Sequence, residues 1–424
     1  MNMQNMKCRF IVNPFFWFTF VWTLILLIHT LNMLEIYPAA PTELFIFMIG
    51  ILLLSVVFGV IYQKVFLKGR TQIALDNDNP NWVWIIACLG GFILEVLYSR
   101  MIPILEVFKG NTSSYQEFGI PHFTFVIVSM TIALTGIASV KLFYGKEHKG
   151  IHIATILMCL GIFLLSYSRG ILIFAFLIVL AVFLTKIRFS LSTIVFLIVL
   201  AVIGSILFNA AGNIRQNAAF NDSTYIMDIA GFKDEYRFLS PFSWVITYVD
   251  TPLGNLCYNF VNIEPLNDTT GLLSQLIPDF ISKRIFPDYN SSLVLIQPGL
   301  TASSMFAGGY KYYGLLGMFL SYIELVALVF ICAFVTRKNT KIFLATTASL
   351  SIMAAMTFFD NMVTYSGYSF FLIFYIIYRF FAHDDTEYIM SQQVIDYIII
   401  NYDDFEELLA WSTSYLSSIK ASLP

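Results

Sequence analysis

The chain has 424 residues, of which 58% are hydrophobic and only 12% are charged, and its mean hydropathy is +0.76. Soluble domains carry roughly 25% charged residues, so a water-soluble globule of this composition would lack the ionisable groups to cover its surface. The composition therefore indicates a membrane protein, and the net charge of −3 provides no basic field for nucleic acid as a partner.

Apolar segments recur along the chain at the length of membrane spans. A bilayer-spanning helix needs about 20 mostly apolar residues. The first segment follows a short basic start and is longer than the roughly 7–15 residues of a signal-peptide core, so we interpret it as an uncleaved span. Ten spans are predicted, at residues 15–34, 44–63, 82–99, 121–142, 151–167, 170–185, 189–209, 312–335, 341–358 and 363–381. The predicted fold class is an all-α polytopic membrane protein.

The distribution of positive charge predicts the orientation of these spans. With the N-terminus inside, the inner segments hold 14 lysines and arginines, whereas the short outer loops hold only Arg100, Lys109 and Arg169. Because short cytoplasmic loops are rich in such residues, both termini are predicted to be cytoplasmic. The chain then divides into seven spans (1–209), one large external loop (210–311), three spans (312–382) and an acidic cytoplasmic tail (383–424).

Arg169 is the first candidate for chemistry, because the string Ser166-Tyr167-Ser168-Arg169-Gly170 places it between two adjoining spans. An unpaired charge there would be expensive within lipid, so the side chain must lie at the outer surface or in a polar cavity. Its planar fork of donors suits a phosphate, although it could also be a topology anchor. Arg215, in Gly212-Asn213-Ile214-Arg215, follows the seventh span on the same predicted side. The two cations could share one diphosphate.

The large loop offers further polar candidates. Arg237, Lys283 and Arg284 are external cations that could bind substrate or could simply be solvated, and Asp250 is one of several carboxylates that could act as a base. The loop contains no histidine, so His122, at the outer start of the fourth span, is the other candidate for proton transfer. Residues 273–281 carry an apolar helical stripe that predicts a helix lying on the outer leaflet or packed on the spans.

No metal or cofactor site is predicted. The five cysteines form no CxxC pair and have no interleaved histidines. Asp76-Asn77-Asp78 has the DxD form of many metal-dependent sugar-nucleotide transferases, but it lies on the predicted cytoplasmic side immediately before Asn79-Pro80. Asp and Asn are favoured at such positions simply as turn and cap residues, and we interpret the motif in that way.

Four strings occur in an order that resembles the Wzy-type O-antigen polymerases, a bacterial family related to the O-antigen ligases. They are SYSRG at an outer helix end, GNIR at the start of the large loop, YVDTPLGNL at 248–256, and TASSMF at 301–306 followed by residues 310–317. The resemblance covers roughly residues 150–330. It implies a GT-C-like glycosyltransferase in the bacterial inner membrane, whose large loop is periplasmic.

The resemblance also implies a reaction and a set of site residues. Such enzymes transfer a glycan from undecaprenyl diphosphate to the next lipid-linked repeat unit, so donor, acceptor and bilayer are the expected partners, and a chain-length regulator is a further candidate. Arg169 and Arg215 match the arginines thought to hold the diphosphate, and Asp250 or His122 remains the candidate base. The expected substrate-binding side chains are Arg237, Lys283, Arg284, Tyr248, Asn255 and Tyr310. Because arginines can stabilise the leaving diphosphate, no metal is required.

One alternative is a binding or scaffold membrane protein of the same assembly. The main alternative is a flippase-like transporter of polysaccharide or lipid in the same pathway. The single large loop argues against it, as does the absence of the half-to-half symmetry that many transporters show.

Overall fold

The structure is a computed structural model that describes residues 11–67, 79–111, 117–187, 190–216 and 218–381. The described residues are helical and contain no β-strand, apart from one isolated bridge between Leu34 and Phe232. The predicted acidic tail and the DxD motif lie outside these ranges.

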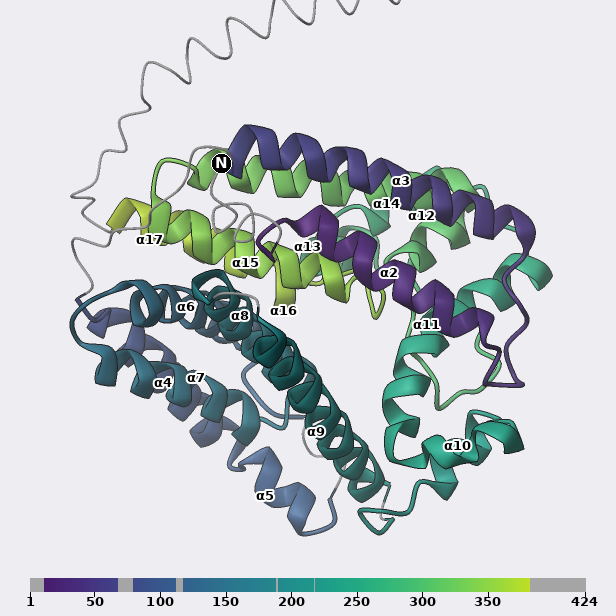
Figure 1. Cartoon of the computed structure of the whole chain (residues 1–424), viewed down its shortest axis with the longest axis horizontal. Coiled ribbons are helices and arrows are strands. Elements are labelled where there is room, and N and C mark those ends of the chain that lie inside the picture. Colours follow the sequence, from purple (N-terminus) through teal and green to yellow (C-terminus); the bar gives the residue numbers. More distant parts are fainter. Residues whose placement is uncertain (1–10, 68–78, 112–116, 188–189, 217, 382–424) are drawn as a thin grey trace, which may run out of the picture. The chain divides into compact units, whose positions relative to one another are not determined.

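In the part of the chain that the structure describes, eight helices and one π-helical turn precede the large loop. They are α2 (Pro14–Thr30), α3 (Thr42–Tyr62) with its π-helical extension η1 (Gln63–Leu67), α4 (Trp82–Ser99), α5 (Pro103–Phe108), α6 (Thr124–Tyr144), α7 (Lys149–Leu165), α8 (Arg169–Lys186) and α9 (Leu191–Arg215). The loop contains α10 (Thr224–Ile229), the 3-10 helix η3 (Asp234–Phe242), α11 (Ser243–Asn262), α12 (Thr269–Gln275) and α13 (Asp279–Ile285). The chain continues with α14 (Phe306–Thr336), α15 (Thr340–Met356), α16 (Ser366–Ser369) and α17 (Phe371–Phe381) (Figure 1).

Among the described residues, six helices are long and apolar enough to cross a membrane, namely α3 with η1, α4, α6, α8, α9 and α14. Three more apolar helices, α2, α7 and α15, have 17 residues each. The predicted tenth span, 363–381, is not one continuous helix, because it is divided into α16 and α17. The Asp279 carboxylate accepts hydrogen bonds from the backbone N–H and the hydroxyl of Ser366. These bonds attach the start of α16 to α13.

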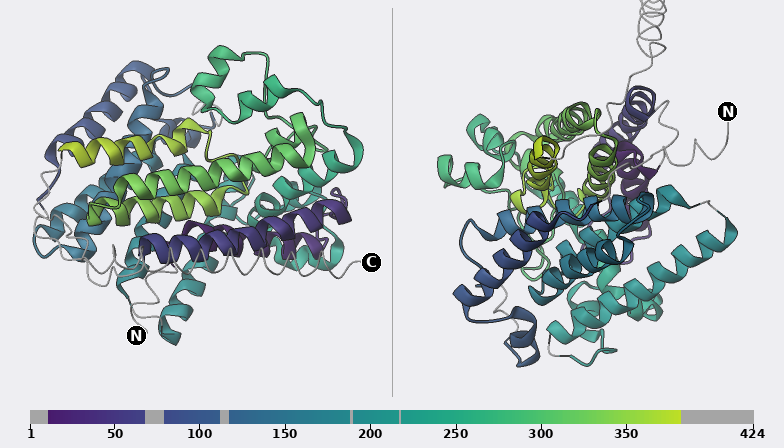
Figure 2. Two further views of the ribbon diagram at one scale, coloured as in Figure 1. Left: turned by 90° about the horizontal axis from the view of Figure 1, so that it is seen from above. Right: turned by 90° about the vertical axis from the view of Figure 1, so that its left-hand side faces the viewer.

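The tightest packing involves α2, α6 and α15. α15 lies against α2, α6, α8 and α14, and α6 lies against α4, α7 and α8 (Figures 1 and 2). The buried faces of α6 and α15 carry small and hydroxyl side chains. In α6, the hydroxyls of Thr131, Thr135 and Ser139 each donate a hydrogen bond to the backbone carbonyl four residues earlier. Small residues allow helix backbones to approach closely, which is how membrane helices associate without a hydrophobic drive.

The large loop is integrated into the bundle through α11, which packs against α2, α9 and α14. Gly254 is required for this approach, because a Cβ atom there would lie 2.3 Å from the Tyr37 ring. The predicted loop boundaries differ from the structure, since α9 continues to Arg215 and α14 begins at Phe306. The single helix predicted over 273–281 is wrong: Pro278 separates α12 from α13, since its ring disfavours helical backbone in the preceding residue.

Candidate functional site

Arg169 is placed by a tight turn between α7 and α8. Tyr167 adopts a left-handed conformation with φ 55°, and the backbone N–H of Ser168 donates to the carbonyl of Phe163 at 3.0 Å. The chain therefore reverses within three residues, and Arg169 becomes the first residue of α8. A guanidinium at this position lies beside the positive end of the helix dipole, and both attract an anion.

Arg215 is the last residue of α9, and the C-terminal turn of this helix packs against Trp244 of α11. Gly212 admits the indole, since a Cβ atom there would lie 2.6 Å from the ring. The side-chain oxygen of Asn213 accepts a hydrogen bond from the indole nitrogen at 2.7 Å. The guanidinium carbon of Arg215 then lies 5.6 Å from the centre of the Trp244 ring. Gly212, Asn213 and Arg215 thus form one local unit around this tryptophan.

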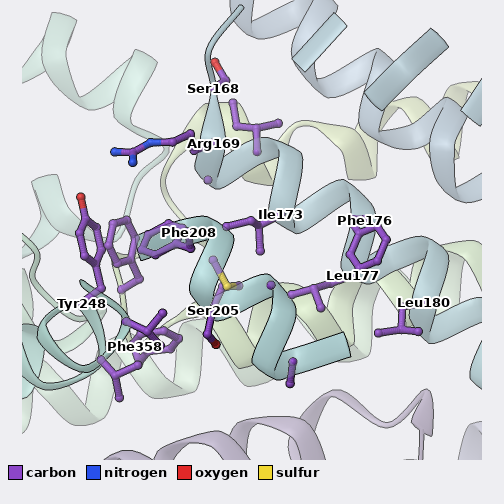
Figure 3. A pocket seen from close by; sticks show the side chains of 18 of the residues that line it. Ser168, Arg169, Ile173, Phe176, Leu177, Leu180, Ser205, Phe208, Tyr248 and Phe358 are labelled. Carbon is purple, nitrogen blue, oxygen red and sulfur yellow. The ribbon is translucent and has the colours of Figure 1, made fainter. Parts of the chain in front are cut away.

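Both arginines line one cavity of about 690 Å³. The cavity lies between α8, α9 and α11 and is also lined by residues 356, 358, 359 and 368. Figure 3 shows Arg169 at one end, where the aromatic side chains of Phe208 and Tyr248 lie beside it. The guanidinium carbon of Arg169 is 5.6 Å from the centre of the Phe208 ring. Two cations that are 46 residues apart in the chain therefore face the same space.

The remaining walls of this cavity are mostly apolar. On α8, Ile173, Phe176, Leu177 and Leu180 recur at helical spacing along the cavity (Figure 3). On α9, the opposing wall consists of Leu197, Leu200, Ala201, Gly204 and Ser205. These two facing walls form an apolar lane between α8 and α9. Because α8 begins where α9 ends, both arginines lie at the same end of the lane. The arrangement suits a molecule with an anionic head and a long apolar tail.

Tyr248 is the candidate substrate-binding residue that the structure also brings to this cavity. Its ring stacks on Phe359 with the centroids 5.5 Å apart and meets Phe208 edge-on at 5.4 Å. Tyr248 therefore forms part of an aromatic wall next to the cations.

Asp250, the candidate base, faces the opposite side of α11 and does not line this cavity. Its carboxylate lies 2.6 Å from Nδ1 of His29 on α2, and Sγ of Cys257 lies 3.6 Å from Nε2 of the same ring. A Cys–His–Asp set has the residue types of a nucleophilic triad. However, all three side chains are buried and line neither described cavity, so the geometry makes them a link between α2 and α11.

The other charged candidates are distributed over the surface. Arg237 pairs with Asp228 and Asp234 at 3.2 and 3.0 Å, and Lys283 pairs with Asp279 at 2.7 Å. Arg284 is exposed on α13, and His122 is exposed in the turn before α6. None of these four side chains lines the cavity that holds Arg169 and Arg215.

Asn255 and Tyr310 are buried in the loop scaffold. The Asn255 amide donates to the carbonyls of Leu300 and Ala302 at 3.0 and 3.1 Å. The Tyr310 hydroxyl donates to the carbonyl of Ile263 at 2.9 Å. Both residues therefore position backbone segments of the loop.

Sequence reasoning missed Phe208, Trp244 and Phe359, although all three shape the cation-bearing region. Trp244 could have been singled out from the sequence, because it is the one tryptophan between residues 210 and 311. Phe208 and Phe359 resemble any other aromatic residue at a helix end. Among the described residues, no three His, Cys, Asp or Glu side chains gather as metal ligands.

No protein-family model, curated protein or solved structure matches this chain.

Proposed function

We propose that this protein is a polymerising glycosyltransferase that transfers an oligosaccharide from undecaprenyl diphosphate to the next lipid-linked repeat unit. The site would face the periplasm, in a ten-span, GT-C-like protein of the bacterial inner membrane. The observation that carries the proposal is that Arg169 and Arg215 line one cavity, at the same end of its apolar lane. A polyprenyl diphosphate has the matching chemistry of a dianionic head and an apolar tail.

The proposed chemistry depends on leaving-group stabilisation. When an acceptor hydroxyl displaces the diphosphate from the anomeric carbon, negative charge develops on the departing phosphate oxygens. Guanidinium groups already positioned beside those oxygens stabilise this charge without further reorganisation. Their planar donors can also fix the orientation of the phosphates through paired hydrogen bonds. Under this proposal the isoprene units next to the diphosphate follow the lane between α8 and α9.

The direct test is a polymerisation assay with purified protein and a synthetic lipid-diphosphate oligosaccharide. We expect a ladder of longer glycans from the wild-type protein. Arg169→Lys and Arg215→Lys keep the charge but lose the planar geometry, so each should slow transfer roughly tenfold to a hundredfold. Arg237→Lys is the matched control, because this external arginine pairs with Asp228 and Asp234 outside the cavity.

Two results would overturn the proposal. Wild-type glycan lengths from both Arg169→Lys and Arg215→Lys would make these residues mere headgroup anchors. Absence of a ladder, together with movement of the lipid-linked unit between the leaflets of reconstituted vesicles, would establish the transporter alternative.

A further inference from the structure

A second, smaller cavity of about 160 Å³ adjoins the first. Tyr248 and Phe359 line both cavities, so their stacked rings form the common wall. The smaller cavity also differs in character, because four serine and threonine side chains and one carboxylate line it. These are Thr247, Thr251, Thr301, Ser303 and Asp360. A mixed wall of aromatic rings and hydroxyls offers both apolar surface and hydrogen-bonding groups to a small polar ligand.

One hydroxyl in this wall has an unused hydrogen-bonding capacity. Thr247 is 1% exposed, and its hydroxyl has no hydrogen-bond partner among the described residues. Thr251, one helical turn further along α11, accepts a hydrogen bond from Tyr37 at 3.2 Å. A buried hydroxyl without a partner is unfavourable, because it has lost its hydrogen bonds to water and gained none in the protein. A ligand hydroxyl in the cavity would supply the partner that Thr247 lacks.

The opposite wall, residues 299–303, is fixed by the rest of the loop. Asn255 holds it by donating to the carbonyls of Leu300 and Ala302. The cavity is therefore built by contacts within the protein that do not require a ligand to form.

Asp360 is the ionisable side chain in this wall. It lies between α15 and α16, and its carboxylate accepts a hydrogen bond from the backbone N–H of Asn361 at 2.7 Å. Burial raises the pKa of this carboxyl and outweighs the hydrogen bond from Asn361, which lowers the pKa; the nearby Asp279 raises the pKa further, whereas Lys283 lowers it. A carboxylate with a raised pKa is a better proton acceptor than an ordinary surface aspartate.

We propose that the smaller cavity binds the attacking hydroxyl-bearing sugar of the acceptor, and that Asp360 accepts the proton of that hydroxyl. This inference rests on the proposed function. The acceptor oxygen forms a bond to the anomeric carbon while the bond from that carbon to the diphosphate oxygen breaks. The electron pair leaves with the diphosphate beside Arg169 and Arg215. The proton moves to Asp360 and then to solvent.

The test separates donor binding from transfer. Asp360→Asn keeps the size of the side chain but cannot accept the proton, so we expect transfer to fall about a hundredfold or more. Direct binding of an undecaprenyl-diphosphate donor analogue should be unchanged, because the arginine cavity is intact. Asp234→Asn is the matched control, since the Asp234 side chain is 98% exposed on η3. Thr247→Val should raise the acceptor KM several-fold and leave donor binding unaltered.

The outcomes distinguish this inference from the proposed function. A wild-type ladder accompanied by normal transfer from Asp360→Asn would overturn the role of Asp360. An unchanged acceptor KM in Thr247→Val would overturn the location of the acceptor site, even if Asp360→Asn proved too unstable to assay. Absence of a ladder from the wild-type protein would instead refute the proposed function.

Discussion

Helices α6 and α9 are both apolar enough to cross a membrane, but they differ completely in what surrounds them. In α6, 72% of the apolar window is buried against other helices, whereas in α9 none of it is. The buried face of α6 is rich in Ser, Thr, Ala and Gly. The exposed face of α9 consists of large aliphatic residues such as Ile198 and Leu207, which are 57% and 64% exposed.

This difference shows that apolarity alone does not predict burial in a membrane protein. Lipid is as apolar as a leucine side chain, so small residues rather than large ones mark the faces at which helices meet. The main contacts of α9 are with α11 and η3, near its C-terminal end. The rest of α9 stands apart from α8, and the cavity lies between them. We therefore expect substitutions in the packed region to affect stability and, under the proposed function, substitutions beside the cavity to affect transfer.

The largest effect on stability is expected at the buried link between α2 and α11. Asp250→Ala leaves His29 buried without its carboxylate partner, and breaking such a pair typically costs about 3–5 kcal/mol. Thermal unfolding of the purified protein in detergent measures this loss, with Asp234→Ala as the exposed control. A variant Asp250→Asn that kept full stability but lost transfer would instead make Asp250 the base and would remove the distinction between the two faces of α11.

A pair of glycine substitutions compares α6 and α9 directly. A Cβ atom at Gly136 of α6 would lie 2.1 Å from the buried Tyr375 hydroxyl, whereas one at Gly204 of α9 would meet nothing within 4 Å. Gly136→Ala should therefore destabilise the protein by about 1–3 kcal/mol through overpacking. Gly204→Ala should be neutral or stabilise it by up to about 1 kcal/mol, because alanine favours the helix. Equal melting temperatures for the two variants would contradict the comparison.

A smaller effect is expected where α9 is anchored. Trp244→Phe keeps an aromatic face beside Arg215 but leaves the buried Asn213 side-chain oxygen without its donor. The cost should be about 1–2 kcal/mol in unfolding free energy, with a few-fold loss of transfer as Arg215 becomes less well positioned. Trp82→Phe is the control, since Trp82 is 55% exposed. An Asn213→Ala variant with wild-type stability and transfer would show that the anchor does not position Arg215.

The smallest effect is expected from metal removal. If guanidinium groups carry the leaving-group charge, chelation of divalent ions should leave polymerisation in purified membranes unchanged. The double variant Asp76→Asn, Asp78→Asn should also keep glycan lengths near those of the wild-type protein. Loss of activity in chelator that magnesium restores would mean that the cavity works through a metal rather than through its arginines.

The sequence by itself was sufficient for nine long helices and for the candidate cations Arg169 and Arg215, but not for the short helices of the large loop or for the division between α16 and α17. Each of the first nine predicted spans corresponds to one helix, because long apolar segments must satisfy their backbone hydrogen bonds internally. Arg169 and Arg215 were also found from sequence, since a single arginine at the end of an apolar run is conspicuous. The sequence also predicted that the two arginines lie on the same side, because α8 and α9 are consecutive spans that run in opposite directions. Arg169 begins α8 and Arg215 ends α9, so both lie at one end of this helix pair.

Only the tertiary structure decided which polar residues reach the cavities. Tyr248 and Asp250 lie two residues apart in one motif, and residues at that spacing on a helix point about 200° apart. One therefore lines the cavities while the other faces α2. Asp360 could not be predicted from a sequence motif. Its proximity to α11 depends on how the turn after α15 packs against the large loop. Helical rotation and long-range packing have no signature in local sequence, and they determine which side chains share a site.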